Sequence, residues 1–273
     1  MNAVRRGLLG LMGTLLMSGA SRAGGQKARR SSVTPRHVLC FLGGAHALEP
    51  LSDAAEKAVR DFATGFNVDH TYSQDKPDER MERSFGVSWD RVQPSAWSLA
   101  DEKAVLDHQS VLYVLSPPMT PDNAVTVSTA ALLVVDQLIK AGATAVKGES
   151  AGVAHGLARW NELVLQAGAA LKSNDDIALR RICRLAFTKR PLAAEVYLES
   201  VGFHLVGLPE VYIPKSRGTD GEVSALMDTV ADEIARNGLE PTLKARGARL
   251  FFDTDFAEDD FKFNPYGIVK LAS

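Results

Sequence analysis

The sequence predicts an α+β protein made of two adjacent ferredoxin-like halves, and two features of the chain support this. Apolar runs of strand length and segments of helical periodicity follow one another in the order β-α-β-β-α-β between residues 37 and 147. This is the order of the split ferredoxin-like unit. A second set of helices and strands follows. We therefore expect halves at 37–156 and 157–273, although no sequence repeat indicates duplication.

The first half is expected to begin with a strand at 37–42 and a helix that starts at Ser52 and ends at Gly65. The polar segment 74–100 contains Trp89 and Trp97 and is expected to be a long irregular insertion, a type of segment that is often functional. The other predicted elements are strands at 66–72, 110–116 and 143–147 and a helix at 122–140.

The second half contains a clear amphipathic helix at 222–237, which Asn237-Gly238 ends. A second helix is expected at 157–171, with Trp160 on its apolar face. Strands are predicted at 177–187, 194–204, 211–213, 248–253 and 267–271.

Composition limits the possible functions. The 273 residues are 45% hydrophobic, enough to bury a large core. The formal net charge is -2, so no global basic surface for nucleic acid is present. Residues 1–30 carry six positive charges and no acid, which leaves -8 on the rest of the chain. The body is therefore acidic.

The basic start of the chain has the pattern of a secretion signal. Arg5-Arg6 precede an apolar run at 7–20, and Ser21-Arg22-Ala23 approximates a cleavage site. The arginine pair also resembles a twin-arginine signal, so Sec and twin-arginine routes both stay open. The run is too short for an ordinary membrane span, and no later run is long enough for one. We expect 1–36 to lie outside the fold and the protein to be periplasmic or secreted; the alternative is a cytoplasmic protein with a disordered leader.

The segment 148–152, Gly-Glu-Ser-Ala-Gly, matches the G-x-S-x-G pattern of the nucleophile elbow in serine hydrolases. A strand before it and a helix after it agree with that pattern. However, His155 is too close in sequence to arrive from a separate loop, and His204 lies in a half-buried run. No oxyanion sequence precedes the motif. We therefore expect a strand-to-helix turn, and we keep an esterase that uses Ser150 and His204 as the alternative.

Polar side chains near this turn are candidates for ligand contact. Glu149, Ser150, His155 and Trp160 gather at one strand end, where the start of the following helix favours polar ligands. The acidic run from Asp253 to Asp260 lacks the calcium-loop pattern, and no nucleotide, metalloprotease or zinc-ribbon motif is present. The sequence thus predicts no cofactor and no metal.

Two cysteines, Cys40 and Cys183, lie in apolar runs whose spacing indicates neither a disulfide framework nor a metal site. We expect both to be buried as small hydrophobic residues. Export would permit a disulfide bond between them, and the sequence does not show whether they meet.

Several segments together resemble an uncharacterised bacterial family, domain of unknown function 4261. They include 141–146 with the following Ser150–His155, the helix that bears Trp160, and 201–211 with its Gly-Leu-Pro-Glu stretch. The terminal Asn-Pro-Tyr-Gly at 264–267 also fits. The resemblance covers roughly residues 38–273, and Lys147-Gly148-Glu149 departs from it. It implies a fold in which the Ser-Ala-Gly segment is structural, and it implies no activity.

Taken together, these patterns favour a non-enzymatic binding or interaction protein. Its partner is unknown and is expected to be a protein that contacts the acidic surface or the loop 74–100. The serine hydrolase that uses Ser150 is the alternative.

The signal interpretation predicts cleavage after Ala23. Mass spectrometry of the mature N-terminus, performed on separated cell compartments, should find a chain that begins at Gly24 in the periplasmic or secreted fraction. An intact Met1 or Asn2 in the cytosol would contradict export.

Overall fold

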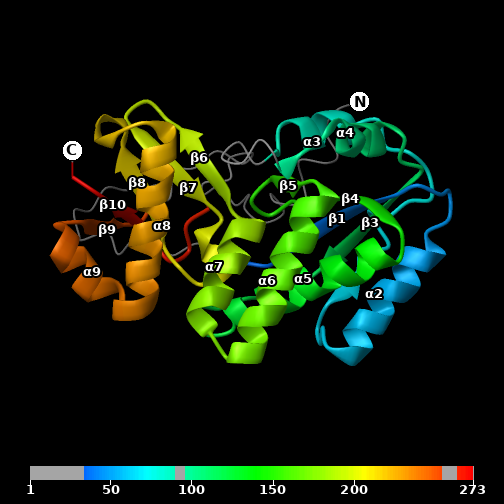
Figure 1. The fold of residues 1–273 in the computed structure, drawn as a ribbon, viewed down its shortest axis with the longest axis horizontal. Coiled ribbons are helices and arrows are strands. Elements are labelled where there is room, and N and C mark those ends of the chain that lie inside the picture. Colours follow the sequence, from blue (N-terminus) through cyan, green and yellow to red (C-terminus); the bar gives the residue numbers. More distant parts are fainter. Residues whose placement is uncertain (1–33, 90–95, 254–262, 273) are drawn as a thin grey trace, which may run out of the picture.

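The computed structural model describes residues 34–89, 96–253 and 263–272 (Figure 1). Two five-stranded sheets lie side by side, with helices packed against each. The helices are α2 (Glu49–Asp61), α3 (Met81–Gly86), α4 (Leu99–Leu106), α5 (Ala124–Lys140), α6 (Leu157–Ser173), α7 (Asp176–Phe187), α8 (Asp220–Asn237) and α9 (Leu239–Arg246), with 3-10 turns η2 (Phe203–Val206) and η3 (Lys215–Arg217). The strands are β1 (Val38–Gly43), β2 (Asn67–Val68), β3 (Ser110–Leu115), β4 (Ala143–Gly148), β5 (Val153–His155), β6 (Lys189–Ala193), β7 (Tyr197–Val201), β8 (Glu210–Pro214), β9 (Arg249–Phe251) and β10 (Ile268–Lys270).

The first sheet is antiparallel throughout and has the strand order β2-β3-β1-β4-β5. Its central strand β1 pairs Phe41 with Leu112 of β3 on one side and with Val146 of β4 on the other. β1 is hydrogen-bonded on both edges, and its residues Leu39–Leu42 are buried because apolar cores cover both faces of the sheet.

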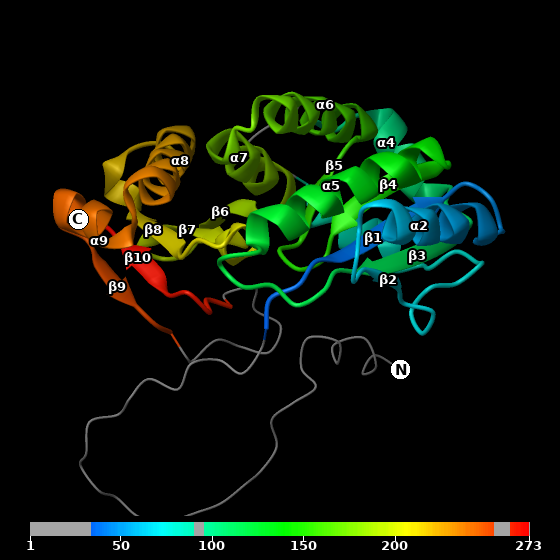
Figure 2. The same ribbon diagram turned by 90° about the horizontal axis from the view of Figure 1, so that it is seen from below.

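Side chains of β1 alternate between two cores, as the period of a strand requires. Leu39 and Phe41 point into the core formed with helices α2, α5, α6 and α7. Cys40 and Leu42 point to the opposite face and pack with Met81 and Phe85 of α3 and with Val105 of α4. Figure 2 shows α2, α5 and α6 together on one side of this sheet. The insertion helices α3 and α4 therefore cover the other side.

The second sheet has the strand order β6-β7-β8-β10-β9. β10 pairs in parallel with β8 and antiparallel with β9. Val211, Ile213 and Val269 point from the sheet into a second core, where they meet Met227 and Val230 of α8. This half has its own apolar centre, and the mixed α/β architecture is confirmed.

His37, just before β1, joins the two halves through buried hydrogen bonds. The Ser128 hydroxyl on α5 donates its one hydrogen to the Leu205 carbonyl at 2.6 Å. The Nε2–H of His37 must therefore be the donor in the 2.7 Å contact with the Ser128 oxygen. The imidazole also lies 4.5 Å from the Phe187 ring of α7. Burial, together with the nearby charge of His204, lowers the pKa of His37 to about 3, so the ring is neutral at neutral pH.

A second buried contact, an ionic one, connects helix α7, which packs mainly in the first core, with helix α8, which packs in the second. Arg184 of α7 has no exposed surface and donates from Nε to Asp228 at 3.1 Å and from Nη2 to Asp232 at 3.0 Å, both on α8. Its guanidinium also lies 5.7 Å from the centre of the Phe203 ring. Removal of either partner would leave a buried charge without compensation, so this contact holds α7 against α8.

The strand predicted at 177–187 is wrong, because α7 occupies this segment. Leu179, Ile182, Cys183 and Ala186 recur at helical spacing and are all buried, and the Asp175 side chain caps the helix by accepting from Ala178 N at 2.9 Å. The strand predicted at 194–204 is shorter, because Gly202 adopts a φ of 94° and the chain turns into η2. Strand β6 and helix α9 were not predicted, so the element order of the second half differs from that of the first.

The segment 74–100 is not irregular throughout, since it contains α3 and the first turn of α4. The predicted burial of the cysteines is confirmed: Cys40 and Cys183 are both buried, in different cores, and no disulfide bond joins them. Burial raises the pKa of the Cys183 thiol to about 12.

Within the described ranges, no helix combines the length and apolar character needed to cross a membrane. The leader 1–33 and most of the acidic run 253–260 lie outside the described residues.

The buried neutral His37 predicts a specific loss of acid stability. Because its folded-state pKa of about 3 lies below the ordinary value of 6.5, unfolding takes up a proton between these two pH values. The free energy of unfolding should therefore fall as the pH drops below 6.5, by up to about 1.4 kcal/mol per pH unit from this group. Denaturant unfolding from pH 7 to pH 4 should show a flatter dependence in His37→Gln. The exposed His46→Gln exchange is the control, and equal slopes in wild type and His37→Gln would contradict the assignment.

Candidate functional site

Ser150 lies in the turn between β4 and β5, and its hydroxyl is bound to the backbone next to His37. Ser150 Oγ accepts from Val38 N at 2.9 Å and donates to the Arg36 carbonyl at 2.7 Å. Within the described part of the chain, neither bond of this hydroxyl involves a histidine. The hydroxyl connects the turn to the start of β1, which is a structural use of the G-x-S-x-G segment.

His204, the other residue of the hydrolase alternative, belongs to a separate buried network around Glu210. Glu210 accepts from the His204 ring at 3.0 Å, from the Ser200 hydroxyl at 2.6 Å, and from the backbone N–H groups of Gly202 and His204 at 3.1 and 3.3 Å. Gly202 packs directly on the turn that bears Ser150, because a β-carbon at this position would lie 2.6 Å from that of Ala151. The two segments are therefore neighbours, but Glu210 orients the histidine.

Of the predicted ligand contacts, His155 and Trp160 lie in the interior. His155 Nε2 lies 3.1 Å from the Ala186 carbonyl, and Trp160 donates to the Val146 carbonyl at 3.3 Å. Their rings meet edge to face at 4.8 Å. Glu149 is nearer the surface and forms a 2.8 Å ion pair with Lys147. The structure thus separates Glu149 and Ser150 from the two aromatic side chains, and their ligand contact stays a prediction.

A surface hollow of about 360 Å³ lies instead between α3 and α4, partly on residues of the predicted insertion 74–100 and partly on the rest of α4. Its volume is near the lower end of the range for small-ligand pockets. The lining combines acidic and apolar side chains with one arginine: Glu79, Glu82, Arg83, Gly86, Trp89, Glu102, Val105 and Leu106.

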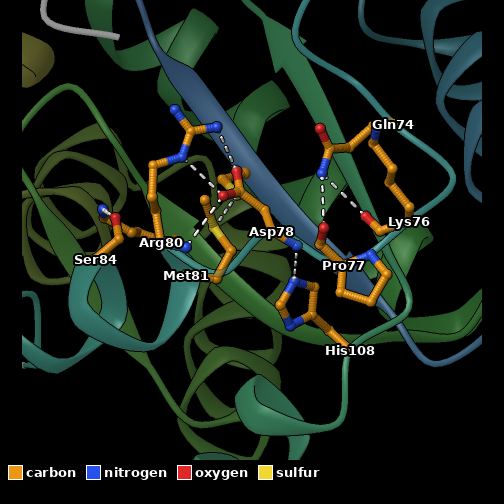
Figure 3. A network of polar contacts seen from close by, with 10 residues as sticks. Gln74, Lys76, Pro77, Asp78, Arg80, Met81, Ser84 and His108 are labelled. Atoms are coloured by element: carbon orange, nitrogen blue, oxygen red, sulfur yellow. Dashed lines mark hydrogen bonds and ion pairs between the residues drawn. The ribbon is translucent and has the colours of Figure 1, made fainter. Parts of the chain in front are cut away.

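A polar network holds the chain at the start of α3 (Figure 3). The Asp78 carboxylate accepts from Arg80 Nε at 2.8 Å and Nη2 at 2.9 Å, and this pairing raises the pKa of Arg80. Asp78 N donates to His108 Nε2 at 2.9 Å, so the His108 proton is on Nδ1 and points to the Val105 carbonyl. Because Val105 is in α4 and His108 follows it, this network ties the two helices of the hollow together.

Lys147 contacts α3 on the side that faces the first sheet. It extends from β4, and its ammonium contacts the Ser84 hydroxyl at 2.5 Å and lies 6.0 Å from the centre of the Phe85 ring. Only 4% of Lys147 is exposed, and the ion pair with Glu149 compensates the buried charge. Lys147 and Glu149 therefore have a structural role next to α3.

The other side of the hollow is fixed by the capping residues of α4. Ser98 and Asp101 form a reciprocal capping box at its N-terminus. Asp101 also accepts from Leu157 N at 3.1 Å, which ties α4 to the start of α6. The backbone next to Trp89 runs along β5, with Ala154 N donating to the Ser88 carbonyl at 2.7 Å. The walls of the hollow are thus attached to the first sheet.

The acidic side chains of the hollow carry uncompensated charge. Glu79, Glu82 and Glu102 are all exposed, and none has an ion-pair partner among the described residues. By contrast, Glu149, Glu162 and Glu233 are each paired with a lysine or an arginine. The sequence indicated the insertion but not these three glutamates, because exposed acidic residues are common on solvated helix faces.

Within the described ranges, no cluster of three or more His, Cys, Asp or Glu side chains that could hold a metal ion occurs. Comparisons with protein-family models, curated proteins and solved structures found no match for this chain. Membership of domain of unknown function 4261 therefore stays a prediction.

The bonds of Ser150 predict how its replacement behaves. Ser150→Ala removes one acceptor and one donor at the start of β1 and should lower the free energy of unfolding by about 1–2 kcal/mol. Labelling by a fluorophosphonate probe should be absent in wild type and variant alike. Ser173→Ala, whose hydroxyl bonds only within its own helix end, is the control for stability. Labelling that depends on Ser150, with ester hydrolysis, would instead establish the hydrolase.

Proposed function

We propose that this protein is a non-enzymatic binding protein that holds a segment of a partner polypeptide in the hollow between α3 and α4. The observation that carries the proposal is a hollow lined by the exposed Leu106 and by three exposed carboxylates that have no ion-pair partner among the described residues, with Leu99 on α4 and Val87 directly after α3 also exposed. Leu99 is 82% exposed, Leu106 59% and Val87 53%. Apolar groups left in water beside a polar rim are typical of interaction surfaces.

The location of the hollow supports this function. The Asp78–His108 hydrogen bond joins its two helices and Lys147 attaches α3 to the first sheet, so a binding surface there would be preorganised. The bonds of Ser150 and His204 to other groups support binding over acyl transfer.

We infer in addition that the first half is a ferredoxin-like unit and that the leader directs export. The order β2-β3-β1-β4 with antiparallel pairing agrees with a split β-α-β unit. The basic start followed by an apolar run supports export. Neither inference is needed for the binding proposal.

A random-peptide display library selected on the whole chain tests the binding function. Peptides should be enriched on the wild type and lost on Leu99→Ser/Leu106→Ser, because the double exchange removes the exposed apolar groups. Leu165→Ser is the matched control, since Leu165 is 74% exposed on α6, away from the hollow. Failure to enrich peptides, or equal enrichment on the double variant, would overturn the proposal.

A further inference from the structure

We propose that the partner segment is a cationic amphipathic helix, which places its apolar side chains in the α3–α4 hollow and its lysines or arginines beside Glu79, Glu82 and Glu102. This inference rests on the proposed binding function and adds the chemistry of the partner. Three observations carry it: the charge of the lining, the pattern along α4 and the size of the hollow.

The charge of the lining selects a cation. Three carboxylates face one guanidinium, that of Arg83, which leaves a local charge of about −2. The negative charges of the three carboxylates repel one another. In the described part of the chain, no cationic side chain forms an ion pair with them. Lysine or arginine side chains from a partner would remove this repulsion. Electrostatic complementarity of this kind also discriminates against acidic partners.

The exposed face of α4 selects the spacing of the partner. Leu99, Glu102 and Leu106 are three and then four residues apart, so they form one stripe along the helix. Inside the fold, α4 buries Val105 alone, which leaves this stripe free for an external contact. An apolar–acidic–apolar stripe matches a partner that alternates apolar and basic residues along one face.

The size of the hollow selects how the partner sits. A volume of about 360 Å³ accepts a few side chains and not a whole helix. The helix therefore lies across α3 and α4 with its apolar anchors between them. Trp89 and Val105 form the apolar wall that these anchors would contact. This arrangement corresponds to helix-in-groove recognition with anchors at i, i+3 or i+4.

The test uses three fluorescent peptides of about 14 residues, or roughly four helical turns. The first has leucine and lysine at amphipathic helical spacing, the second has glutamate for each lysine, and the third has the composition of the first without its periodicity. Fluorescence anisotropy on the full-length chain should show binding of the first peptide. Binding of the second should be absent, and that of the third at least about tenfold weaker, a difference of 1.4 kcal/mol.

Variants locate the binding to the hollow. Glu82→Lys/Glu102→Lys should raise the Kd of the leucine–lysine peptide at least about tenfold. Leu99→Ser/Leu106→Ser should do the same, while Glu240→Lys on the distant α9 and Leu165→Ser on α6 should leave it unchanged. Thermal melting of each variant verifies that it is folded. The affinity should also fall as the salt concentration rises from about 0.05 to 0.5 M.

Two outcomes would overturn the inference. One is equal affinity for the lysine and glutamate peptides, and the other is a Kd that the Glu82/Glu102 exchange leaves unchanged. These failures are distinct from a failure of the binding function. If the display library yields peptides that depend on Leu99 and Leu106 but carry no basic residues, the hollow binds a partner of other chemistry, and only this inference is wrong.

Discussion

The buried hydrogen bond from His37 to Ser128 is the contact on which the arrangement of the two halves depends. It leads from the start of β1 through α5 to the Leu205 carbonyl, and the imidazole packs on Phe187 of α7. A neutral imidazole suits these two consecutive hydrogen bonds, since Nε2–H donates and the ring bears no charge that burial would penalise. Ser116 accepts from His37 N, so both the backbone and the ring of this residue are held.

The turn that contains Ser150 serves the same junction. Its hydroxyl bonds on both sides of His37, to the Arg36 carbonyl and to Val38 N. On the opposite side of the turn, Ala151 packs against Gly202, whose φ of 94° suits a residue without a β-carbon. The G-x-S-x-G segment therefore contacts both the start of β1 and the second half, and helps to hold them together. The strand-to-helix turn predicted at Ser150 is wrong, because the turn joins the antiparallel strands β4 and β5, and a serine at its tip serves through its two short backbone bonds.

The insertion between β2 and β3 combines two contrasting environments. Buried polar side chains at its base have partners: Asp78 is paired with Arg80, His108 is hydrogen-bonded at both ring nitrogens, and Lys147 forms an ion pair with Glu149. Toward solvent, Glu79, Glu82 and Glu102 have no ion-pair partner among the described residues, and Leu99 and Leu106 are exposed. The side chains that face the sheet hold the insertion in one conformation, whereas those that face solvent still have charges and apolar groups to offer. Such a surface is suited to binding, because a partner then meets groups that need little reordering.

The sequence by itself determined the strands and helices with strong periodicity: β1, β3, α5, α8 and the buried cysteines follow from local apolar patterns. It also indicated that 74–100 is an unusual segment. The helix at 177–187 is encoded locally as well, in the helical spacing of its buried apolar residues after the capping Asp175, and only the contact of Arg184 with α8 was decided by the tertiary structure. The same holds for the sites. Whether Ser150 meets a histidine, and whether Glu79, Glu82 and Glu102 converge, depends on contacts between residues far apart in the chain, and local pattern carries no information about such distances.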